Sequence, residues 1–362
     1  MHKVVFLSWH YYNSKRRAGF HHLATSLSKK KYNVVFIASV VSIFTFLRRE
    51  KILYEKHFLR NSFQNLKFNN VTSIINFSLL RPPLSRSSPI FELISSIFFR
   101  LNRKSLREIS NADTIVFEST IAIYFFYKVK SINPNARIIY RASDDMEVFS
   151  ASKKILEFEK SLLAKFDVVS VTTRSHFDKL YKISPNNLKL HYHGVDKDLF
   201  NAANLNPFKN KINIVFVGTR DLDENFIELA SRQFSNYQFH VVGPFNPCVK
   251  RNNVTYHGYM SFKDTLPYIK YASIALQTVT SNNGLISFFT DSNKILQYSF
   301  CKLPIIAPSV INAQHRTNFF YYEYNDIKSI INCIEDALEF DRSNFNLEVN
   351  SWDELALELI QT

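Results

Sequence analysis

The sequence predicts an α/β protein made of two doubly wound domains that face each other across a central cleft. Short apolar runs of strand length alternate with helical stretches in both halves of the chain. The runs have continuous Val, Ile and Phe character, which is typical of parallel strands buried on both faces of a sheet. At 362 residues the chain is longer than one core usually allows, and its 46% apolar content is enough for two.

The first half alternates strands with helices. The predicted strands are Lys3–Ser8, Asn33–Ser39, Val71–Phe77, Thr114–Phe117, Arg137–Tyr140, Val168–Val171 and Leu188–Tyr192. Helical spacing of apolar residues predicts helices over Gly19–Lys30, Ile90–Ser110, Ala122–Ile132 and Ser152–Lys165. This alternation favours parallel strands joined by crossover helices.

The second half repeats the pattern after a polar stretch around Pro207. Its predicted strands are Asn213–Val217, Phe239–Val242, Val254–His257, Ile274–Gln277 and Leu303–Ala307. We therefore predict a first domain over residues 1–200 and a second over residues 201–345. Residues 346–362 are expected to form a helix that packs back towards the first domain, because their end alternates acidic and apolar residues at helical spacing.

Glycine is rare, and its positions indicate a ligand site. Four of the six glycines directly follow a predicted strand, namely Gly194, Gly218, Gly243 and Gly258. Glycine lets a backbone or a ligand approach closely, and open α/β sheets bind ligands at the carboxyl ends of their strands. No GxGxxG motif follows the first strand, which argues against a standard dinucleotide-binding domain.

The positive charge lies almost entirely in the first third of the chain. Residues 1–105 hold 18 Lys and Arg against three Glu, a net charge of +15, whereas the whole chain carries +14. An anionic partner is therefore expected. The stretch Ile90–Ile109 has an aromatic-rich apolar body and a basic end, as in a helix at a lipid headgroup layer, although an ordinary half-buried helix has the same pattern. No nucleic-acid-binding motif accompanies the charge, so a membrane surface is favoured.

The remaining composition excludes several classes. Three cysteines at unrelated spacings indicate a reduced, cytoplasmic interior rather than a disulfide scaffold or a zinc site. The longest apolar run, Val34–Leu47, is too short to span a bilayer, which needs about 20 residues. The N-terminus does not resemble a signal peptide.

Two predicted strands of the first half end in acidic and polar residues. Asp144 follows the strand Arg137–Tyr140, so its carboxylate could remove a proton from an acceptor hydroxyl, and the adjacent Asp145 could raise its pKa. Glu118 and Ser119 end the strand before it and are expected at the same rim of the sheet. Capping of a helix N-terminus is the alternative in each case.

A basic group follows the first strand. Arg16 and Arg17, with His21, fill the loop and the start of the next helix. Guanidinium groups bind phosphate or carboxylate with two hydrogen bonds, and a helix N-terminus adds partial positive charge. A solvated basic turn is the alternative.

The second half offers two places for a diphosphate. Gly218 and Thr219 follow its first strand and lead into Arg220, which could clamp the phosphates. A second candidate is the N-terminus of the helix that begins near Ser292 and Asn293.

This helix also carries two candidate side chains. Lys294 stands in its first turn, and Gln297, on the same face, could reach a ribose hydroxyl. A solvated lysine and a surface glutamine are the alternative. No Ser-His-Asp or metal-ligand grouping stands out, so no metal is expected.

Together these residues resemble the GT-B glycosyltransferases, and most specifically the membrane-associated glucuronosyltransferase family typified by GumK. The strongest similarity covers Ala112–Asp144, which ends in the letters YRASD. It continues at His193-Gly194-Val195-Asp196, at Arg16-Arg17-Ala18 with His21, at Gly258-Tyr259-Met260 and at Asp291–Tyr298.

The resemblance implies a function. Members transfer a sugar from a UDP-sugar to a lipid-diphosphate-linked oligosaccharide at the cytoplasmic face of the bacterial inner membrane, in surface polysaccharide biosynthesis. They are peripheral, invert the anomeric carbon, and need neither metal nor cofactor.

The resemblance also implies roles for single residues. Asp144 matches the general base. The nucleotide site includes Gly258, Tyr259 and Met260 near the uracil, together with Lys294 and Gln297. Beyond these roles, we expect the acceptor side or another part of the cleft to include Arg16, Arg17, His21, Glu118, Ser119 and His193.

Two departures leave the donor sugar open between glucuronate and another hexose. Tyr259 replaces an acidic residue of the family, and Arg220 replaces an apolar one. Three other readings stay open: a retaining GT-B transferase, a nucleotide-sugar 2-epimerase, and a non-catalytic glycan- or lipid-binding module. The paired glutamates of retaining enzymes are not found, since Gln297 stands at the place of the later one.

Overall fold

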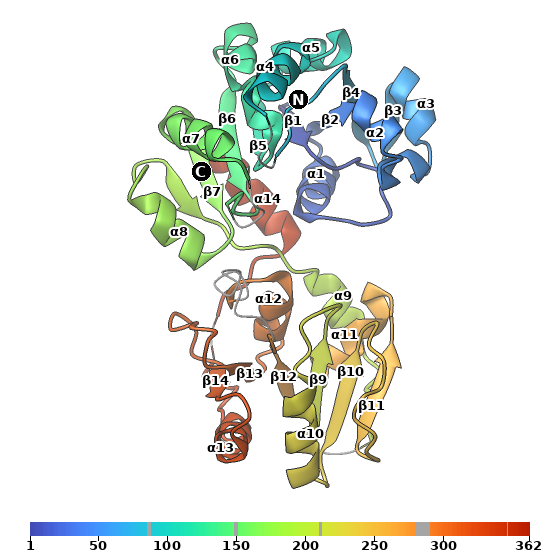
Figure 1. Cartoon of the computed structure of the whole chain (residues 1–362), viewed down its shortest axis with the longest axis vertical. Coiled ribbons are helices and arrows are strands. Elements are labelled where there is room, and N and C mark those ends of the chain that lie inside the picture. Colours follow the sequence, from blue (N-terminus) through green and yellow to red (C-terminus); the bar gives the residue numbers. More distant parts are fainter. Residues whose placement is uncertain (85–87, 148–150, 210–211, 280–289, 346) are drawn as a thin grey trace. The chain divides into compact units, whose positions relative to one another are not determined.

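The computed structural model describes residues 1–362 except 85–87, 148–150, 210–211, 280–289 and 346. The chain forms two compact units (Figure 1). Unit 1 comprises Met1–Tyr192 and Trp352–Thr362, and unit 2 comprises His193–Ser351. The boundary predicted at residue 200 falls inside helix α9 (Lys197–Ala202), so the chain enters unit 2 earlier than predicted.

Unit 1 is built on an eight-stranded sheet with the order β3-β4-β2-β1-β5-β6-β7-β8. The strands are β1 (Lys3–Ser8), β2 (Asn33–Ser42), β3 (Leu66–Phe68), β4 (Val71–Ser78), β5 (Thr114–Glu118), β6 (Arg137–Ala142), β7 (Val168–Val171) and β8 (Leu188–Leu190). Among the strands that the structure describes in this unit, only the edge strand β3 is antiparallel to its neighbour. It was not predicted, because three half-exposed residues carry too little pattern.

Apolar cores lie on both faces of this sheet. Val5 and Leu7 of β1 belong to one buried cluster, whereas Val4 and Phe6 belong to another. This explains why β1 is apolar at successive positions rather than at alternate ones. The helices of unit 1 are α1 (Gly19–Lys29), α2 (Ile43–Leu47), α3 (Phe58–Phe63), α4 (Pro89–Phe98), α5 (Arg103–Ser110), α6 (Phe126–Ile132), α7 (Lys153–Leu162), α8 (Arg174–Tyr181) and α14 (Trp352–Gln361).

Helix α14 follows unit 2 in sequence but packs against α1 in unit 1 (Figure 1). Leu355 and Leu359 are buried in the same cluster as Leu23 of α1. The Trp352 ring stacks on His22, with ring centroids 4.6 Å apart. The end of the chain is therefore an integral part of the first core.

The single helix predicted over Ile90–Ser110 is wrong, because the structure has two helices there. Phe99 and Leu101, between them, turn into the core. Asn102 then caps α5 by accepting a hydrogen bond from the Ser105 N–H at 2.9 Å. The apolar body and the basic end of the predicted helix thus belong to α4 and α5 respectively.

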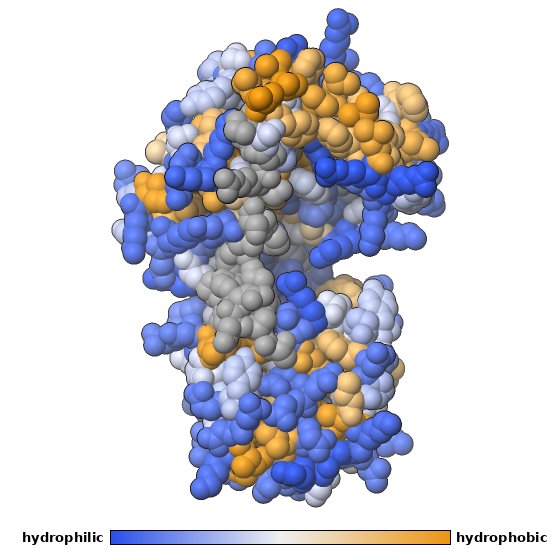
Figure 2. All heavy atoms as spheres, in the orientation of Figure 1, coloured by the Kyte–Doolittle hydropathy of each residue, from blue (hydrophilic) through white to orange (hydrophobic). Residues whose placement is uncertain are grey.

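Many large apolar side chains of unit 1 are exposed. Figure 2 shows them gathered over the part that carries α2, α3 and α4. They include Phe46, Leu47, Leu59, Phe63, Ile90, Leu93, Ile94, Ile97 and Phe98. Among the residues that the structure describes, no helix combines the length and the apolar character needed to cross a bilayer.

Unit 2 contains a six-stranded, fully parallel sheet with the order β11-β10-β9-β12-β13-β14. The strands are β9 (Asn213–Val217), β10 (Gln238–Val242), β11 (Val254–Gly258), β12 (Ile274–Leu276), β13 (Ile305–Pro308) and β14 (Phe319–Tyr322), and the last was not predicted. The helices are α9, α10 (Glu224–Gln233), α11 (Phe262–Lys270), α12 (Asn293–Phe300) and α13 (Ile327–Leu338).

Candidate active site

In unit 1, the carboxyl ends of β1 and β5 meet at Glu118. The two strands are neighbours in the sheet. The buried Glu118 carboxylate accepts hydrogen bonds from the Ser8 hydroxyl at 2.7 Å and from the Trp9 N–H at 2.8 Å. Nε2 of His10 lies 3.6 Å from the other carboxylate oxygen. Glu118 therefore orders the segment after β1, a contact that the sequence did not reveal.

Asp144 follows β6, the next strand along, and lies beside this group. Its N–H donates to the Ser119 hydroxyl at 3.3 Å. The residue keeps an exposed surface, yet the surrounding protein desolvates the carboxyl and raises its pKa, as does the negative charge of Glu118. The nearby His10 and Arg16 act in the opposite direction.

The capping alternative for Asp144 does not hold among the described helices. The next helix, α7, begins at Lys153 with Ser152 as its N-cap. The neighbouring Asp145 is structural, because it is buried and its Oδ2 pairs with Lys179 Nζ at 2.5 Å. Two adjacent carboxylates thus have different roles, and Asp144 is the one that faces solvent.

Arg16, Arg17 and His21 are close in sequence but differ in exposure and contacts. Arg16 is exposed. The Arg17 guanidinium donates to the Tyr12 carbonyl at 3.0 Å and to the Thr25 hydroxyl at 2.8 Å. These two hydrogen bonds connect the loop after β1 to helix α1. Of the two, Arg16 is the guanidinium that fits the predicted role of contacting an acceptor.

The expectation that His21 contacts an acceptor is corrected by its burial. Its Nδ1 accepts a hydrogen bond from the Ala18 N–H at 2.9 Å, and its Nε2 lies 2.9 Å from the Tyr11 carbonyl. Burial lowers the pKa of His21 to about 3. A neutral, buried ring with both nitrogens engaged positions the loop after β1 instead.

In unit 2, three glycines meet where β9, β10 and β11 end. The Gly243 N–H donates to the Gly258 carbonyl at 2.9 Å, and a Cβ on Gly243 would lie 1.9 Å from the Gly218 carbonyl oxygen. Gly258 has a φ of +71°, which favours glycine. The predicted grouping of glycines is thus present for these three, whereas Gly194 lies after β8.

The residues next to these glycines are mostly solvent-facing. Thr219, Arg220 and Tyr259 are exposed, and Met260 is half-buried. The Arg220 side chain is 73% exposed, with its Nε 3.3 Å from Asp221. These side chains are therefore accessible to a ligand at the glycine-lined edge.

The N-terminus of α12 lies at the carboxyl end of β9. Lys294 Nζ lies over the Phe216 ring, 4.6 Å from its centroid, and the Tyr298 hydroxyl accepts a hydrogen bond from the Val217 N–H at 3.2 Å. Burial lowers the pKa of Lys294 to about 7, although Asp221 acts in the opposite direction. Asn293 is exposed, while Ser292 and Gln297 are half-buried.

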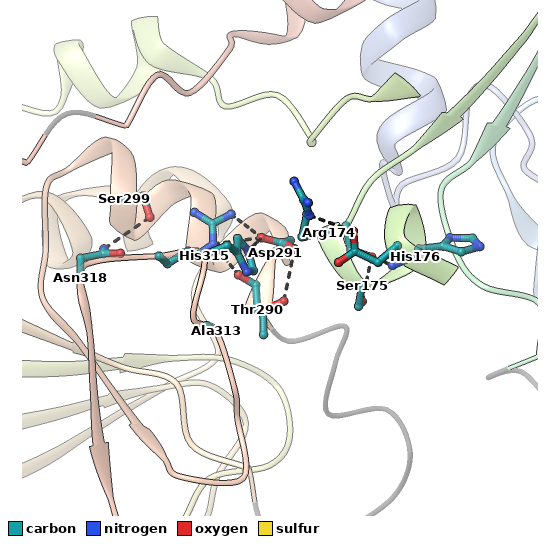
Figure 3. A network of polar contacts seen from close by, with 12 residues as sticks. Arg174, Ser175, His176, Thr290, Asp291, Ser299, Ala313, His315 and Asn318 are labelled. Atoms are coloured by element: carbon teal, nitrogen blue, oxygen red, sulfur yellow. Dashed lines mark hydrogen bonds and ion pairs between the residues drawn. The ribbon is translucent and has the colours of Figure 1, made fainter. Parts of the chain in front are cut away.

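A buried ion pair that the sequence did not predict precedes α12 (Figure 3). The Asp291 carboxylate accepts hydrogen bonds from Arg316, 2.5 Å from its Nη2, and lies 2.9 Å from His315 Nε2. Arg316 also donates to the Thr290 carbonyl at 2.7 Å. This network joins the start of α12 to the segment between β13 and β14.

His193, the remaining predicted site residue, is half-buried and begins unit 2.

Each unit, taken by itself, carries a sheet that is parallel apart from the edge strand β3 of unit 1, and each sheet has polar residues at the carboxyl ends of its strands. This architecture is the GT-B fold, as three solved structures show. Anabaena Alr3699/HepE in complex with UDP and glucose has a TM-score of 0.57 and 11% identity, and the match covers 100% of this chain and 95% of that chain. The UDP-GlcNAc 2-epimerase of Neisseria meningitidis bound to UDP-GlcNAc has a TM-score of 0.55 and 10% identity, with 99% of this chain and 98% of that chain covered. Arabidopsis thaliana UGT89C1 complexed with quercetin has a TM-score of 0.53 and 8% identity, again with 99% of this chain and 98% of that chain covered. At these identities the likeness concerns the fold alone, and it confirms the predicted fold class.

Sequence comparison is more specific. Residues 6–172 match the family described as glucuronosyltransferase GumK, N-terminal domain. Over 243 residues, 66% of this chain, the sequence is 31% identical to the UDP-glucuronate:glycolipid 2-beta-glucuronosyltransferase of Xanthomonas campestris pv. campestris, and the match spans 60% of that relative's length. Residues 6–172 are therefore similar to the GumK N-terminal domain, and the predicted resemblance is confirmed.

Proposed function

We propose that this protein is a glycosyltransferase that moves a sugar, with glucuronate as the first candidate, from a UDP-sugar to a glycolipid. The observation that carries the proposal is Asp144, an accessible carboxylate with a raised pKa beside Glu118 at the strand ends of a GumK-type domain. A base whose pKa is raised towards the working pH is suited to removing a hydroxyl proton. The relative's name supplies glucuronate and glycolipid as the substrates to test first.

The proposed reaction inverts the anomeric carbon. Asp144 takes the proton of the acceptor hydroxyl as its oxygen attacks C1 of the sugar, and the bond from C1 to the UDP β-phosphate breaks. The charge that develops on the diphosphate is met by Lys294 and by the N-terminus of α12, with Arg220 as a further donor. Since these groups neutralise the leaving group, we expect turnover to persist in EDTA.

The proposal also covers the chemical class of the acceptor and the location of the enzyme in the cell. We expect a lipid-diphosphate-linked oligosaccharide, presented at the cytoplasmic face of a bacterial inner membrane during surface polysaccharide synthesis. The net charge of +15 over residues 1–105 and the exposed apolar side chains of α2, α3 and α4 support peripheral attachment to such a surface.

The first test is Asp144→Asn. The variant should bind UDP as the unchanged protein does, because Asp144 and the nucleotide residues lie in different units, and should lose turnover by about 100-fold or more. Thermal shift with UDP and with UDP-glucuronate, UDP-glucose, UDP-galactose and UDP-N-acetylglucosamine measures binding. Sugar transfer to a lipid-linked glycan measures turnover. A variant that retains most activity would remove Asp144 from the mechanism.

The same assay separates the alternatives. UDP release without any acceptor would favour a nucleotide-sugar 2-epimerase, a class that shares this fold. Retention of the anomeric configuration in the product would favour a retaining transferase. No stabilisation by any nucleotide would favour a binding module.

A further inference from the structure

Two cavities in unit 1 share a wall made of Trp9 and Arg81. The larger has a volume of about 400 Å³ and the smaller of about 290 Å³. The Arg81 guanidinium lies over the Trp9 ring, 5.1 Å from its centroid, and donates to the Val40 carbonyl at 3.1 Å. It also pairs with Glu50. Three contacts of Arg81, with the Trp9 ring, the Val40 carbonyl and Glu50, therefore fix the wall between the cavities.

The larger cavity, here called the polar cavity, has the chemistry of a carbohydrate site. Its charged and hydroxyl side chains include Ser14, Arg16, Glu50, Lys51 and Glu55. Together they offer both donors and acceptors, as sugar hydroxyls require. Trp9, a residue that is 36% exposed, adds an apolar surface against which a sugar face can pack.

The polar cavity also reaches the candidate base. His10 lines it, and Nε2 of His10 lies 3.6 Å from Glu118. Arg16, which lines it too, is close enough to Asp144 to influence its pKa. A saccharide in this cavity would therefore extend towards Asp144.

The smaller cavity, here called the apolar cavity, is different. Its lining includes Phe44, Leu84 and Phe91, and its charged side chains are Arg48 and Arg81. The Arg48 guanidinium lies over the Phe44 ring at 5.6 Å, and Phe44 contacts Phe91 edge to face at 5.8 Å. Two guanidinium groups among apolar side chains fit an anion that is attached to a hydrocarbon chain.

The apolar cavity lies between helices that expose apolar side chains. Phe44 belongs to α2, which also exposes Phe46 and Leu47, and Phe91 belongs to α4, which also exposes Ile90 and Ile94. Figure 2 shows an apolar surface over the part of unit 1 that carries α2 and α4. A hydrocarbon chain that leaves this cavity would remain in contact with apolar groups.

We propose that the two cavities together bind the lipid-diphosphate end of the acceptor. The first sugar occupies the polar cavity against Trp9, the diphosphate lies between Arg81 and Arg48, and the first units of the lipid chain lie against Phe44 and Phe91. This assignment rests on the proposed function and adds to it the residues that recognise the acceptor lipid. Arg48 is the residue that determines specificity for the lipid diphosphate, because its guanidinium binds the diphosphate and takes no part in the proton transfer.

Tryptophan fluorescence tests this site without catalysis. The chain has two tryptophans, so in a Trp352→Phe background Trp9 alone reports the wall between the cavities. Farnesyl diphosphate, kept below its micelle concentration, should change the Trp9 emission in a saturable way. Arg48→Gln should raise its dissociation constant about tenfold or more. Arg49→Gln, at a neighbour that is also exposed and lines neither cavity, should leave it unchanged.

Three ligands separate the possible sources of the signal. Inorganic diphosphate and farnesol should each bind at least tenfold more weakly than farnesyl diphosphate. Vesicles of phosphatidylglycerol should not reproduce the saturable change. Equal effects of Arg48→Gln and Arg49→Gln, or no saturable change, would overturn the proposal.

Failure of the lipid site and failure of the proposed function can be told apart. If farnesyl diphosphate binds as described but no UDP-sugar is transferred, the transferase assignment fails and the lipid site stands. If transfer proceeds equally well to the same glycan without its lipid diphosphate, with the same KM, the lipid site fails and the transferase stands.

Discussion

Neighbouring charges determine which acidic residue of unit 1 can act as a base. Asp145 is paired with Lys179, and Glu118 is buried with hydrogen bonds from Ser8 and Trp9. Asp144 has a more open position and a raised pKa. At this scale, the partners of each carboxylate distinguish three residues that look alike in the sequence.

The pH dependence of activity should follow from this arrangement. Asp144 must be ionised to act as a base, and Glu118 raises its pKa. Glu118→Gln removes that negative charge while keeping an oxygen that can accept a hydrogen bond, so the acidic limb of the kcat/KM profile should move to lower pH. Glu157→Gln, an exposed site on α7, is the matched control and should leave the limb in place. A limb that moves equally in both variants would contradict the assignment.

Lys294 should couple UDP binding to proton uptake. With a pKa of about 7, the amine is largely neutral at pH 8, and a bound diphosphate favours its charged form. We expect UDP binding at pH 8 to take up close to one proton, and UDP affinity to fall as the pH rises above about 7.

Calorimetry in buffers of different ionisation enthalpy measures this uptake. Lys294→Met should abolish it, and Lys263→Met, at an exposed position of α11, should not. If Lys294→Met took up as many protons on UDP binding as the unchanged protein does, a group other than Lys294 would be the one that is protonated.

At the scale of elements, one buried contact joins helix α7 to β6, the strand that leads to Asp144. The Tyr140 hydroxyl donates to the Glu159 carboxylate. Burial raises the pKa of Glu159 to about 7, well above the 4.5 of an exposed glutamate. The Tyr140 hydrogen bond acts in the opposite direction, because it stabilises the ionised carboxylate, so burial is the larger effect.

The stability of the folded protein should decrease as the pH rises, because the buried Glu159 carboxyl must then ionise. Between pH 4.5 and 7 the folded state holds the Glu159 proton and the unfolded state does not, so the free energy of unfolding falls with pH over that window. Glu159→Gln removes this dependence. Relative to that variant, the unchanged protein should lose about 3 kcal/mol or less between pH 5 and pH 8, measured by urea unfolding at each pH. Parallel curves for the two proteins would show that Glu159 titrates normally.

At the scale of the whole molecule, basic charge and exposed apolar surface occur together in unit 1. Changing the exposed Arg100, Arg103, Lys104 and Arg107 to Gln should release the protein from anionic vesicles. Each such charge contributes about 1 kcal/mol near an anionic surface, so binding should weaken by up to about a thousandfold. Co-sedimentation with phosphatidylglycerol vesicles measures it.

A control with the same loss of charge in unit 2 distinguishes local contact from net charge. It changes the exposed Arg232, Lys250, Lys263 and Lys328 to Gln. Equal weakening in both variants would mean that net charge, rather than the surface around α4 and α5, controls binding.

The sequence by itself determined the α/β class, most of the strands, the glycine-rich edge of unit 2 and the position of Asp144 at a strand end. These features depend on local patterns, since a buried parallel strand is apolar throughout and a polar residue after it lies at the edge of the sheet. The break between α4 and α5 and the edge strands β3 and β14 were missed, because buried Phe99 and Leu101 look helical in sequence and short edge strands carry little pattern.

Only the tertiary structure decided which residues act together. Glu118 meets Ser8, and Arg81 meets Trp9 and Glu50, across separations in sequence that no local pattern encodes. Burial, which is also non-local, turned His21 from a candidate ligand contact into a structural residue and brought the pKa of Lys294 down to about 7. Contacts and desolvation depend on where distant segments pack, and that is why they follow from the fold rather than from the order of residues.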